Sequence, residues 1–433
     1  MTPQANFLVL APLAQGREAD LRKLLARMNH RPGLTDPHNP ILPFGEFDRL
    51  HVARFVILDD PTFGDIAAYG RAPPELPKSL AFLGDCDGPA DEFLADLVER
   101  AGQGLRQIFA HCEGFTVEAD LLSWMKEREK PPAAAYVNWV GRTVRQIREE
   151  SALRDALAAY LMSNAAAIAD DEPRSLRAKL IEFVDAQRRS GLIVLTDPAP
   201  TPLGWQLRNL LHCVGVPLVL LIVSPLLLLY LPVFAYQLRS RELRDPEIVP
   251  RPDAGHVRNL AELEDHDVTN QFSAIGSVKP GLFRRWTVSF LAWLLDYGAR
   301  HIYNRGYLTR VQTIHFARWV FLDGKQRLLF ASNYDGSLES YMDDFINKVA
   351  WGLNLVFSNG VGYPRTRWLI LDGAKDEQKF KFYIRRHELA TEVWYKAYPG
   401  LSAVDLQRNT KIREGIERPS MTDAEIRAWL SLL

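Results

Sequence analysis

Short apolar runs and one strongly periodic helix follow one another in a fixed order along the first third of the chain. Phe7–Ala11 is apolar and short enough for a buried strand, and a helix is predicted over Glu18–Met28. His51–Asp59 is apolar on both faces, which is typical of a strand covered on both sides. Leu80–Leu83 predicts a third strand, which ends in an Asp-Gly turn. The next helix has its apolar positions at Phe93, Leu97, Ala101 and Leu105.

A last short strand is expected near Phe109 and Phe115, and it completes the order β-α-β-β-α-β. This order defines the split βαβ, or ferredoxin-like, motif. One such sheet leaves a face uncovered. Two units that pair face to face would close each other's cores.

The same order occurs a second time in the chain. His51–Asp59 and His315–Asp323 are identical at six of nine positions, and Leu80–Phe115 aligns without a gap to Leu328–Tyr363 with nine identities in 36 positions. Chance identity at average composition is roughly one in sixteen. A further pair of aligned segments, each followed by a helical stretch, is Tyr136–Gly141 and Tyr395–Gly400. The sequence therefore predicts an α+β fold with two tandem ferredoxin-like (split βαβ) repeats that pair as a pseudo-dimeric barrel.

The stretch between the repeats predicts three further segments. The first repeat is assigned to residues 1–157, and the second, with C-terminal helices, to residues 268–433. A helical linker is predicted at 158–208, a hydrophobic membrane segment at 209–238 and a loop at 239–267.

Residues 209–238 contain no Lys, Arg, Asp or Glu, and an apolar run of about eighteen residues or more is a candidate membrane helix. Two full spans would need about 40 residues. Pro217, Pro225 and Pro232 favour kinks, and arginines flank both ends, which suits two cytoplasmic ends. We therefore favour a kinked, re-entrant hairpin that dips into one leaflet, with a single tilted span as the alternative. The lipid bilayer is the expected partner, and the cytoplasmic face of the membrane is the expected location.

The first helix of the second repeat, Leu282–Tyr297, is far more apolar than its counterpart in the first repeat. Trp286, Phe290 and Trp293 recur at helical spacing beside Arg284 and other arginines. Aromatic and basic residues together suit the headgroup level of a membrane. The alternative is a helix buried against the barrel.

Composition excludes several classes of function. The formal net charge is −1, so nothing predicts the clustered basic surface that nucleic acid requires. Cys86, Cys112 and Cys213 have unrelated spacings, which fit neither a disulfide framework nor a zinc site, and no metal site is expected. His387 lies on a charged helix and is expected to be solvated.

His51 and Arg54, and their counterparts His315 and Arg318, are the duplicated polar residues of an otherwise apolar strand. Three positions separate each pair, which predicts opposite faces of the strand. One interpretation is a ligand imidazole and a distal guanidinium in a cavity. The other, which the duplication favours, is a shared role in folding, with each side chain bonded to a turn carboxylate such as Asp87.

Tandem ferredoxin-like units resemble the dimeric α+β barrel superfamily, which includes the dye-decolorizing (DyP-type) peroxidases. The literal motif is Gly-x-x-Asp-Gly at Gly84–Gly88, whereas the second repeat departs from it with Ser332–Gly336. In that family the Asp of the motif is a distal acid–base residue beside haem. The resemblance therefore implies Asp87, with Asp335 as its counterpart, as a catalytic residue. The further candidates are Arg54 and Arg318 as catalytic residues and His51 and His315 as haem-binding residues.

Two classes of function follow. One is a membrane-associated, haem-dependent oxidoreductase of peroxidase type that acts on an apolar or lipid-derived substrate. The other is a non-catalytic, membrane-anchored α+β barrel that binds a lipid, another apolar small molecule or a protein partner, including a second copy of the chain. The order of the elements does not decide between these two classes, because the same fold can support many functions.

Overall fold

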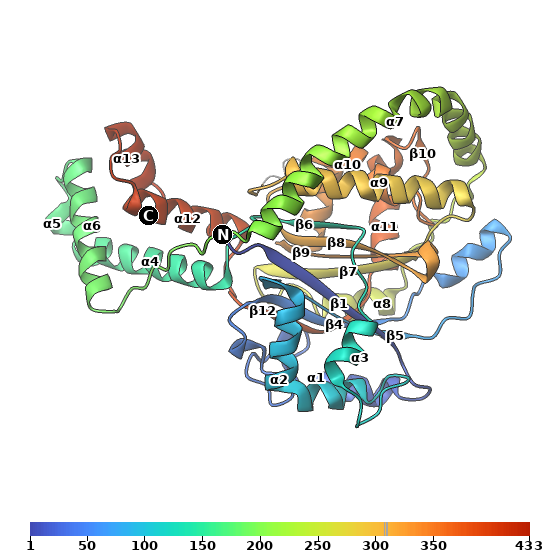
Figure 1. Ribbon diagram of the computed structural model, residues 1–433, viewed down its shortest axis with the longest axis horizontal. Helices are drawn as coiled ribbons and strands as arrows, with labels where there is room; N and C mark the ends of the chain where they lie inside the picture. The colour runs from blue at the N-terminus through green and yellow to red at the C-terminus, as the bar shows by residue number, and fades with distance from the viewer. Residues whose placement is uncertain (307, 309–310) are drawn as a thin grey trace.

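The computed structural model describes residues 1–433 except 307, 309 and 310. Over these residues the fold is mixed α+β, with two four-stranded antiparallel sheets and one long apolar helix (Figure 1). The first sheet has the strand order β1-β5-β4-β12, and the second has the order β6-β8-β9-β7. The strands are β1 Gln4–Pro12, β4 Leu50–Leu58, β5 Ser79–Asp87, β12 Thr391–Lys396, β6 Ala134–Val137, β7 Thr269–Ser277, β8 Ile314–Leu322 and β9 Arg327–Asp335. Two small hairpins are formed by β2 Asn29–Arg31 with β3 Leu34–Thr35, and by β10 Thr366–Arg367 with β11 Leu371–Asp372.

Each sheet takes its fourth strand from the other half of the chain. Strand β12 pairs with β4 so that Trp394 lies opposite Arg54, and β6 pairs with β8 so that Tyr136 lies opposite Ala317. The prediction of a strand near Phe109 is wrong, because the preceding helix, Ala90–Phe109, continues to that residue with its apolar face. The actual last strand of the first repeat is β6, which joins the second sheet.

The two sheets pack against each other through one face. The apolar side chains between them come from strands of both sheets and from Leu389, two positions before β12. They are Leu8, Val56, Leu58, Ala81, Leu83, Ile275, Val320, Leu322, Leu329, Ala331 and Leu389. Every residue of β4 is buried, as its apolar sequence on both faces predicts.

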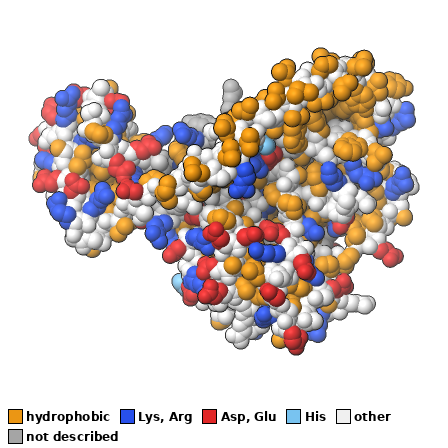
Figure 2. Space-filling view, in the orientation of Figure 1, with side chains coloured by type: hydrophobic (Ala, Val, Ile, Leu, Met, Phe, Trp, Pro, Cys, Tyr) orange, Lys and Arg blue, Asp and Glu red, His pale blue; other side chains and the backbone are white. Residues whose placement is uncertain are grey.

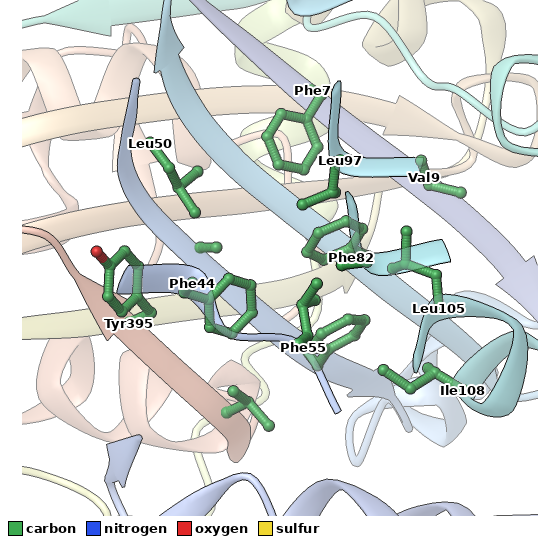
Figure 3. Close-up of a cluster of buried hydrophobic side chains, with 14 of the residues drawn as sticks. Phe7, Val9, Phe44, Leu50, Phe55, Phe82, Leu97, Leu105, Ile108 and Tyr395 are labelled. Atoms are coloured by element: carbon green, nitrogen blue, oxygen red, sulfur yellow. The ribbon is translucent and has the colours of Figure 1, made fainter. Parts of the chain in front are cut away.

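Helices cover the outer face of each sheet. They are α1 Glu18–Ala26, α2 Ala90–Phe109 and α3 Leu121–Glu127 in the first repeat, and α9 Leu282–His301, α10 Leu338–Phe357 and α11 Glu377–His387 in the second. Helices α2 and α10 occupy aligned positions, and both contain one non-helical residue at the same place, Ala101 and Val349. Aromatic rings fill the space between the first sheet and its helices (Figure 3).

A helical lobe projects from one end of the sheets (Figure 1). It contains α4 Val144–Ser163, α5 Ala165–Ile168, α6 Pro173–Arg189, α12 Ala403–Glu417 and α13 Asp423–Leu430. Its own apolar core joins Leu157, Leu180, Ile412 and Trp429. The predicted linker 158–208 is therefore packed against the C-terminal helices for much of its length.

Helix α7 Leu203–Arg244 contains the whole predicted membrane segment. It is one continuous bent helix (Figure 1), and the predicted re-entrant course through one leaflet stays a prediction. Its three prolines bend the helix without ending it, because each removes only one backbone donor. Among the described residues, α7 is the helix long and apolar enough to cross a membrane. The predicted loop 239–267 contains the end of α7 and a short helix, α8 Ala254–Ala261.

Candidate functional site

The first of the two duplicated His–Asp pairs lies at one end of the first sheet. His51 Nε2 lies 2.9 Å from Asp87 Oδ1, and both side chains are buried. The backbone N–H of Val144 donates to the other carboxylate oxygen of Asp87 at 2.9 Å. Val144 is the first residue of α4, and a carboxylate is stabilised at a helix N-terminus.

The second repeat has the same arrangement. His315 Nε2 lies 2.7 Å from Asp335 Oδ1, and the N–H of Ala403, the first residue of α12, donates to Asp335 Oδ2 at 2.7 Å. Burial alone would raise the pKa of Asp335, but the charge of His315 and hydrogen bonds from His315, Thr269 and Ala403 hold it below its ordinary value. Each Asp therefore fixes a helix of the projecting lobe to the end of a sheet.

The spacing of His51 and Arg54 predicts that they lie on opposite faces of β4. This prediction is wrong. The pairing of β4 with β5 shifts between Leu50 and Val52, so His51 is the additional residue of a β-bulge. The His51 ring packs on Phe316 of the second sheet, with 5.2 Å between ring centroids. Both polar side chains consequently face the second sheet, and β8 has the same shift at its histidine.

Arg54 crosses from the first sheet to the second. Its guanidinium donates to the carbonyl oxygens of Phe272 and Ser332, at 2.8 and 2.9 Å, and to Ser273 Oγ at 3.0 Å. It also stacks over the Trp394 ring at 4.9 Å. All three hydrogen bonds reach strands β7 and β9, so Arg54 joins the two sheets.

Arg318 makes the reciprocal connection from the second sheet to the first. It donates to the carbonyl oxygens of Phe7 and Gly84, at 2.7 and 3.0 Å, and to the carboxylate of Asp85. Burial, and then the charge of Arg318, lower the pKa of Arg54 to about 9. Burial raises the pKa of Asp85, although both arginines act to lower it. The buried carboxylate of Asp85 thus interacts electrostatically with two buried guanidinium groups, those of Arg54 and Arg318.

Packing accounts for the Gly-x-x-Asp-Gly motif as well. A Cβ at Gly84 would lie 2.6 Å from a ring carbon of Phe7 and from the carbonyl oxygen of Val52, so only glycine fits there. Gly88 has φ of 79°, in the region that favours glycine, and it turns the chain after Asp87.

The six predicted site residues do not fit haem at this position. The Nε2 atoms of His51 and His315, which would have to face an iron, lie against carboxylates, and Tyr398 Oη lies 3.3 Å from the remaining nitrogen of His51. Apolar and arginine side chains fill the layer between the sheets. The six side chains form a structural network that joins the sheets and the helices.

An apolar cavity of about 330 Å³ lies outside this layer, between the second sheet and its covering helices. Residues of β7, β8, β9, α9, α10 and α11 line it, among them Ala274, Trp319, Phe330, Val288, Leu291 and Leu353. Ile302 and Trp351 belong to the lining and are 62% and 47% exposed, so the mouth lies between the end of α9 and α10. Ligand pockets typically begin at about 300 Å³.

The corresponding space in the first repeat is packed with rings. Phe55 stacks on Phe82 with 4.4 Å between centroids, and Phe7 lies against Phe82 (Figure 3). Phe7 also contacts Phe93. An unfilled apolar cavity lowers stability in proportion to its volume. A cavity present in the second of two duplicated units is therefore a candidate ligand site.

His387 lines the cavity and is 2% exposed, so the prediction of a solvated histidine is wrong. Its ring lies against Gly276, where a Cβ would approach it to 2.6 Å. Neighbouring Arg385 and Arg386 have carboxylate partners, so the charged helix buries one face. Burial lowers the pKa of His387, and its Nδ1 lies 2.8 Å from the carbonyl oxygen of Tyr383. The contact with this carbonyl oxygen makes Nδ1–H the donor, and Nε2 of the neutral ring is then an acceptor.

A second cavity, of about 340 Å³, lies beside β12, and its lining includes His30, His38 and His266. His266 Nε2 bonds to the carbonyl oxygen of Glu262 at 2.9 Å, and His30 lies 3.5 Å from Asp36. Two of its imidazoles thus already have partners, which makes the apolar cavity the stronger candidate.

The N-terminal part of α7 contacts the C-terminal end of α9. His212 Nδ1 lies 2.8 Å from His301 Nε2, and Tyr297 Oη donates to the carbonyl oxygen of Cys213 at 3.3 Å. Helix α9 therefore contacts α7 as well as the cavity.

The other end of α7 contacts the beginning of α9. The rings of Phe234 and Phe283 are 5.3 Å apart. Asp245, directly after α7, accepts hydrogen bonds at 2.7 Å from both Lys279 and Arg284, and all three are buried. Burial lowers the pKa of Lys279 to about 8. Both ends of α7 are consequently fixed to the same body.

The middle of α7 bows away from that body. From Cys213 to Phe234 the helix is about 31 Å long, whereas from Phe283 to Tyr297 α9 measures about 21 Å. Residues 225–233 are exposed on every side of the helix. Figure 1 shows the resulting bend at the top of the view.

Exposed apolar side chains of neighbouring elements extend this surface. Trp286 of α9 is 70% exposed and Phe290 is 42% exposed, while Trp368 and Ile370 project from the tip of the β10–β11 hairpin. Figure 2 shows hydrophobic side chains gathered along α7, with lysines and arginines at one end. The burial predicted as the alternative for this helix is found on one face of α9 only, and its position at the headgroup level of a membrane stays a prediction. We call residues 217–233, Trp286, Phe290, Trp368 and Ile370 the apolar rim.

Comparison with models of known protein families gives no match for this chain, and comparison with curated protein sequences gives no match.

Proposed function

We propose that this protein binds an apolar small molecule at a membrane surface, in the cavity beneath α9. The fold supporting this site is proposed to be a pseudo-dimeric barrel of two ferredoxin-like repeats. The reciprocal arginines and the exchange of β6 and β12 support that interpretation.

The observation that carries the proposal is the double role of α9. Val288 and Leu291 line the apolar cavity, while Phe283 and Tyr297 of the same helix contact α7. A molecule dissolved in the bilayer is therefore one helix away from the binding site. Exposed apolar patches of this kind mark interaction with membranes or other proteins.

Oxidoreductase activity of peroxidase type stays a prediction from the sequence. The residues expected to perform it, such as Arg54 and Asp87, are engaged in bonds between sheets and helices. No observation on the described residues favours it over binding.

Cavity binding can be tested by photolabelling the full-length protein in nanodiscs with a decyl chain that carries a diazirine and an alkyne. We expect labelled peptides from α10 and β7. Gly352 lines the cavity, and a Cβ there meets open space. Gly352→Leu should fill the cavity, raise helix propensity and reduce labelling of these peptides by roughly tenfold or more.

The matched control is Gly64→Leu, since a Cβ at Gly64 also meets open space and the residue is outside the cavity lining. This variant should be labelled like the unmodified protein. Equal labelling of all three proteins would refute binding in this cavity.

We further propose that α7 is inserted in one leaflet, with both ends on the cytoplasmic side. Its two ends contact the two ends of α9, a helix of 20 residues, so a span would place folded parts of the same body on both sides of the bilayer. The apolar rim would lie at the level of the headgroups and acyl chains.

Topology can be tested by cysteine labelling in a Cys213→Ser background, because Cys86 and Cys112 are buried. Asp170→Cys and Arg251→Cys place exposed thiols on either side of α7. Neither should react with an impermeant maleimide in intact cells, and both should react after permeabilisation. A site that reacts from outside while the other does not would show that α7 is a true span.

A further inference from the structure

The apolar cavity has a polar group that the described residues leave without a partner. His387 Nε2 has no hydrogen-bond partner among them, although the ring is almost completely buried. Because Nδ1–H donates to the carbonyl oxygen of Tyr383, Nε2 presents a lone pair. A buried acceptor without a donor is destabilising, so the site favours a ligand that supplies one.

A hydrogen-bond donor, the side-chain amide of Asn359, lies near the C-terminal end of β7, where His387 also lies. Asn359 lines the cavity and is 1% exposed, and its Nδ2 also has no partner among the described residues. Arg284 donates to its Oδ1 at 3.5 Å, which leaves the amide N–H groups free. The N–H of Lys279 donates to the Asn359 carbonyl, and the ring of His387 contacts Gly276, so both groups lie beside the last residues of β7.

We infer that the ligand of this cavity is a long-chain alcohol, an inference that rests on the proposed binding function. A hydroxyl group both donates and accepts hydrogen bonds. Its O–H donates to His387 Nε2, its oxygen accepts from Asn359 Nδ2, and the chain occupies the apolar remainder of the cavity. A carboxylate does not fit, because it has no proton to donate to Nε2 and its charge would be buried among apolar walls.

The experiment compares two photoreactive probes of equal length in nanodiscs, a decyl alcohol and its methyl ether, at equal concentrations in the bilayer. The cavity peptides should be labelled about three- to tenfold more by the alcohol, because the ether cannot donate to Nε2. In His387→Phe the alcohol should label no better than the ether. In His387→Gln, which retains an acceptor, the preference should persist.

The outcomes separate the two proposals. Equal labelling of the cavity by both probes in the unmodified protein overturns the alcohol inference and leaves the binding function in place. Absence of cavity labelling by either probe overturns the binding function itself. If His387→Phe is labelled by neither probe, His387→Gln decides, since a retained preference supports the inference and equal labelling overturns it.

Discussion

Expressed without the rest of the chain, residues 1–157 should aggregate or form a homodimer and should not fold as a soluble monomer. The fragment lacks β12, so β4 loses its partner along one edge. It contains β6, whose partner β8 is missing. The inner face of the sheet, with Leu8 and Val56, would also be exposed to water. Exposed strand edges and apolar faces are both aggregation hazards.

Size-exclusion chromatography and thermal unfolding check this result. The control is coexpression with residues 268–433, which supplies both β12 and the partner of β6, and should recover soluble material that contains both fragments. A monomeric first fragment with a cooperative transition would contradict the need for the exchanged strands.

Arg318→Ala should destabilise the protein by about 3–5 kcal/mol, because it leaves Asp85 buried without its ion-pair partner. Arg54→Ala should cost less, about 1–3 kcal/mol, because it removes hydrogen bonds to the carbonyls of Phe272 and Ser332 without removing the direct partner of a charge. Removal of Arg54 also relieves its repulsion with Arg318.

Denaturant unfolding followed by tryptophan fluorescence measures both differences. The control is Arg318→Ala combined with Asp85→Ala, which should recover part of the loss because no carboxylate is left buried without its direct partner, while Arg54 keeps its hydrogen bonds to Phe272 and Ser332. Unchanged midpoints in the single variants, accompanied by loss of an activity, would assign the arginines to catalysis and not to folding.

The repeat and most of its strands could be predicted because repeated residues and short apolar runs mark them in the sequence. The identities between His51–Asp59 and His315–Asp323 coincide with β4 and β8, which differ from those ranges by one residue at each end. The alignment of Tyr136 with Tyr395 identified corresponding residues of β6 and β12. Local periodicity and repetition are sufficient for such elements.

The remaining features depend on contacts that no local pattern expresses. The faces of His51 and Arg54 were predicted from strict alternation, which the β-bulge interrupts. Exchange of β6 and β12 is a choice of partner between distant segments, and alignment of the two strands says nothing of it. His387 stands beside two arginines in the sequence, yet their carboxylate partners come from elsewhere in the fold and leave its ring facing the cavity.

The exchange of strands also determines when the protein can become complete during synthesis. Strand β4 ends at Leu58, and its partner β12 begins at Thr391, more than three hundred residues later. At ordinary rates of translation this interval lasts roughly twenty seconds to a minute. Helix α7 leaves the ribosome within it, so the bilayer is available to the chain before its first sheet has all four strands. Under the proposed insertion of α7 in one leaflet, membrane contact therefore precedes completion of the fold, and this contact would keep the open edge of the nascent chain away from other nascent chains in solution.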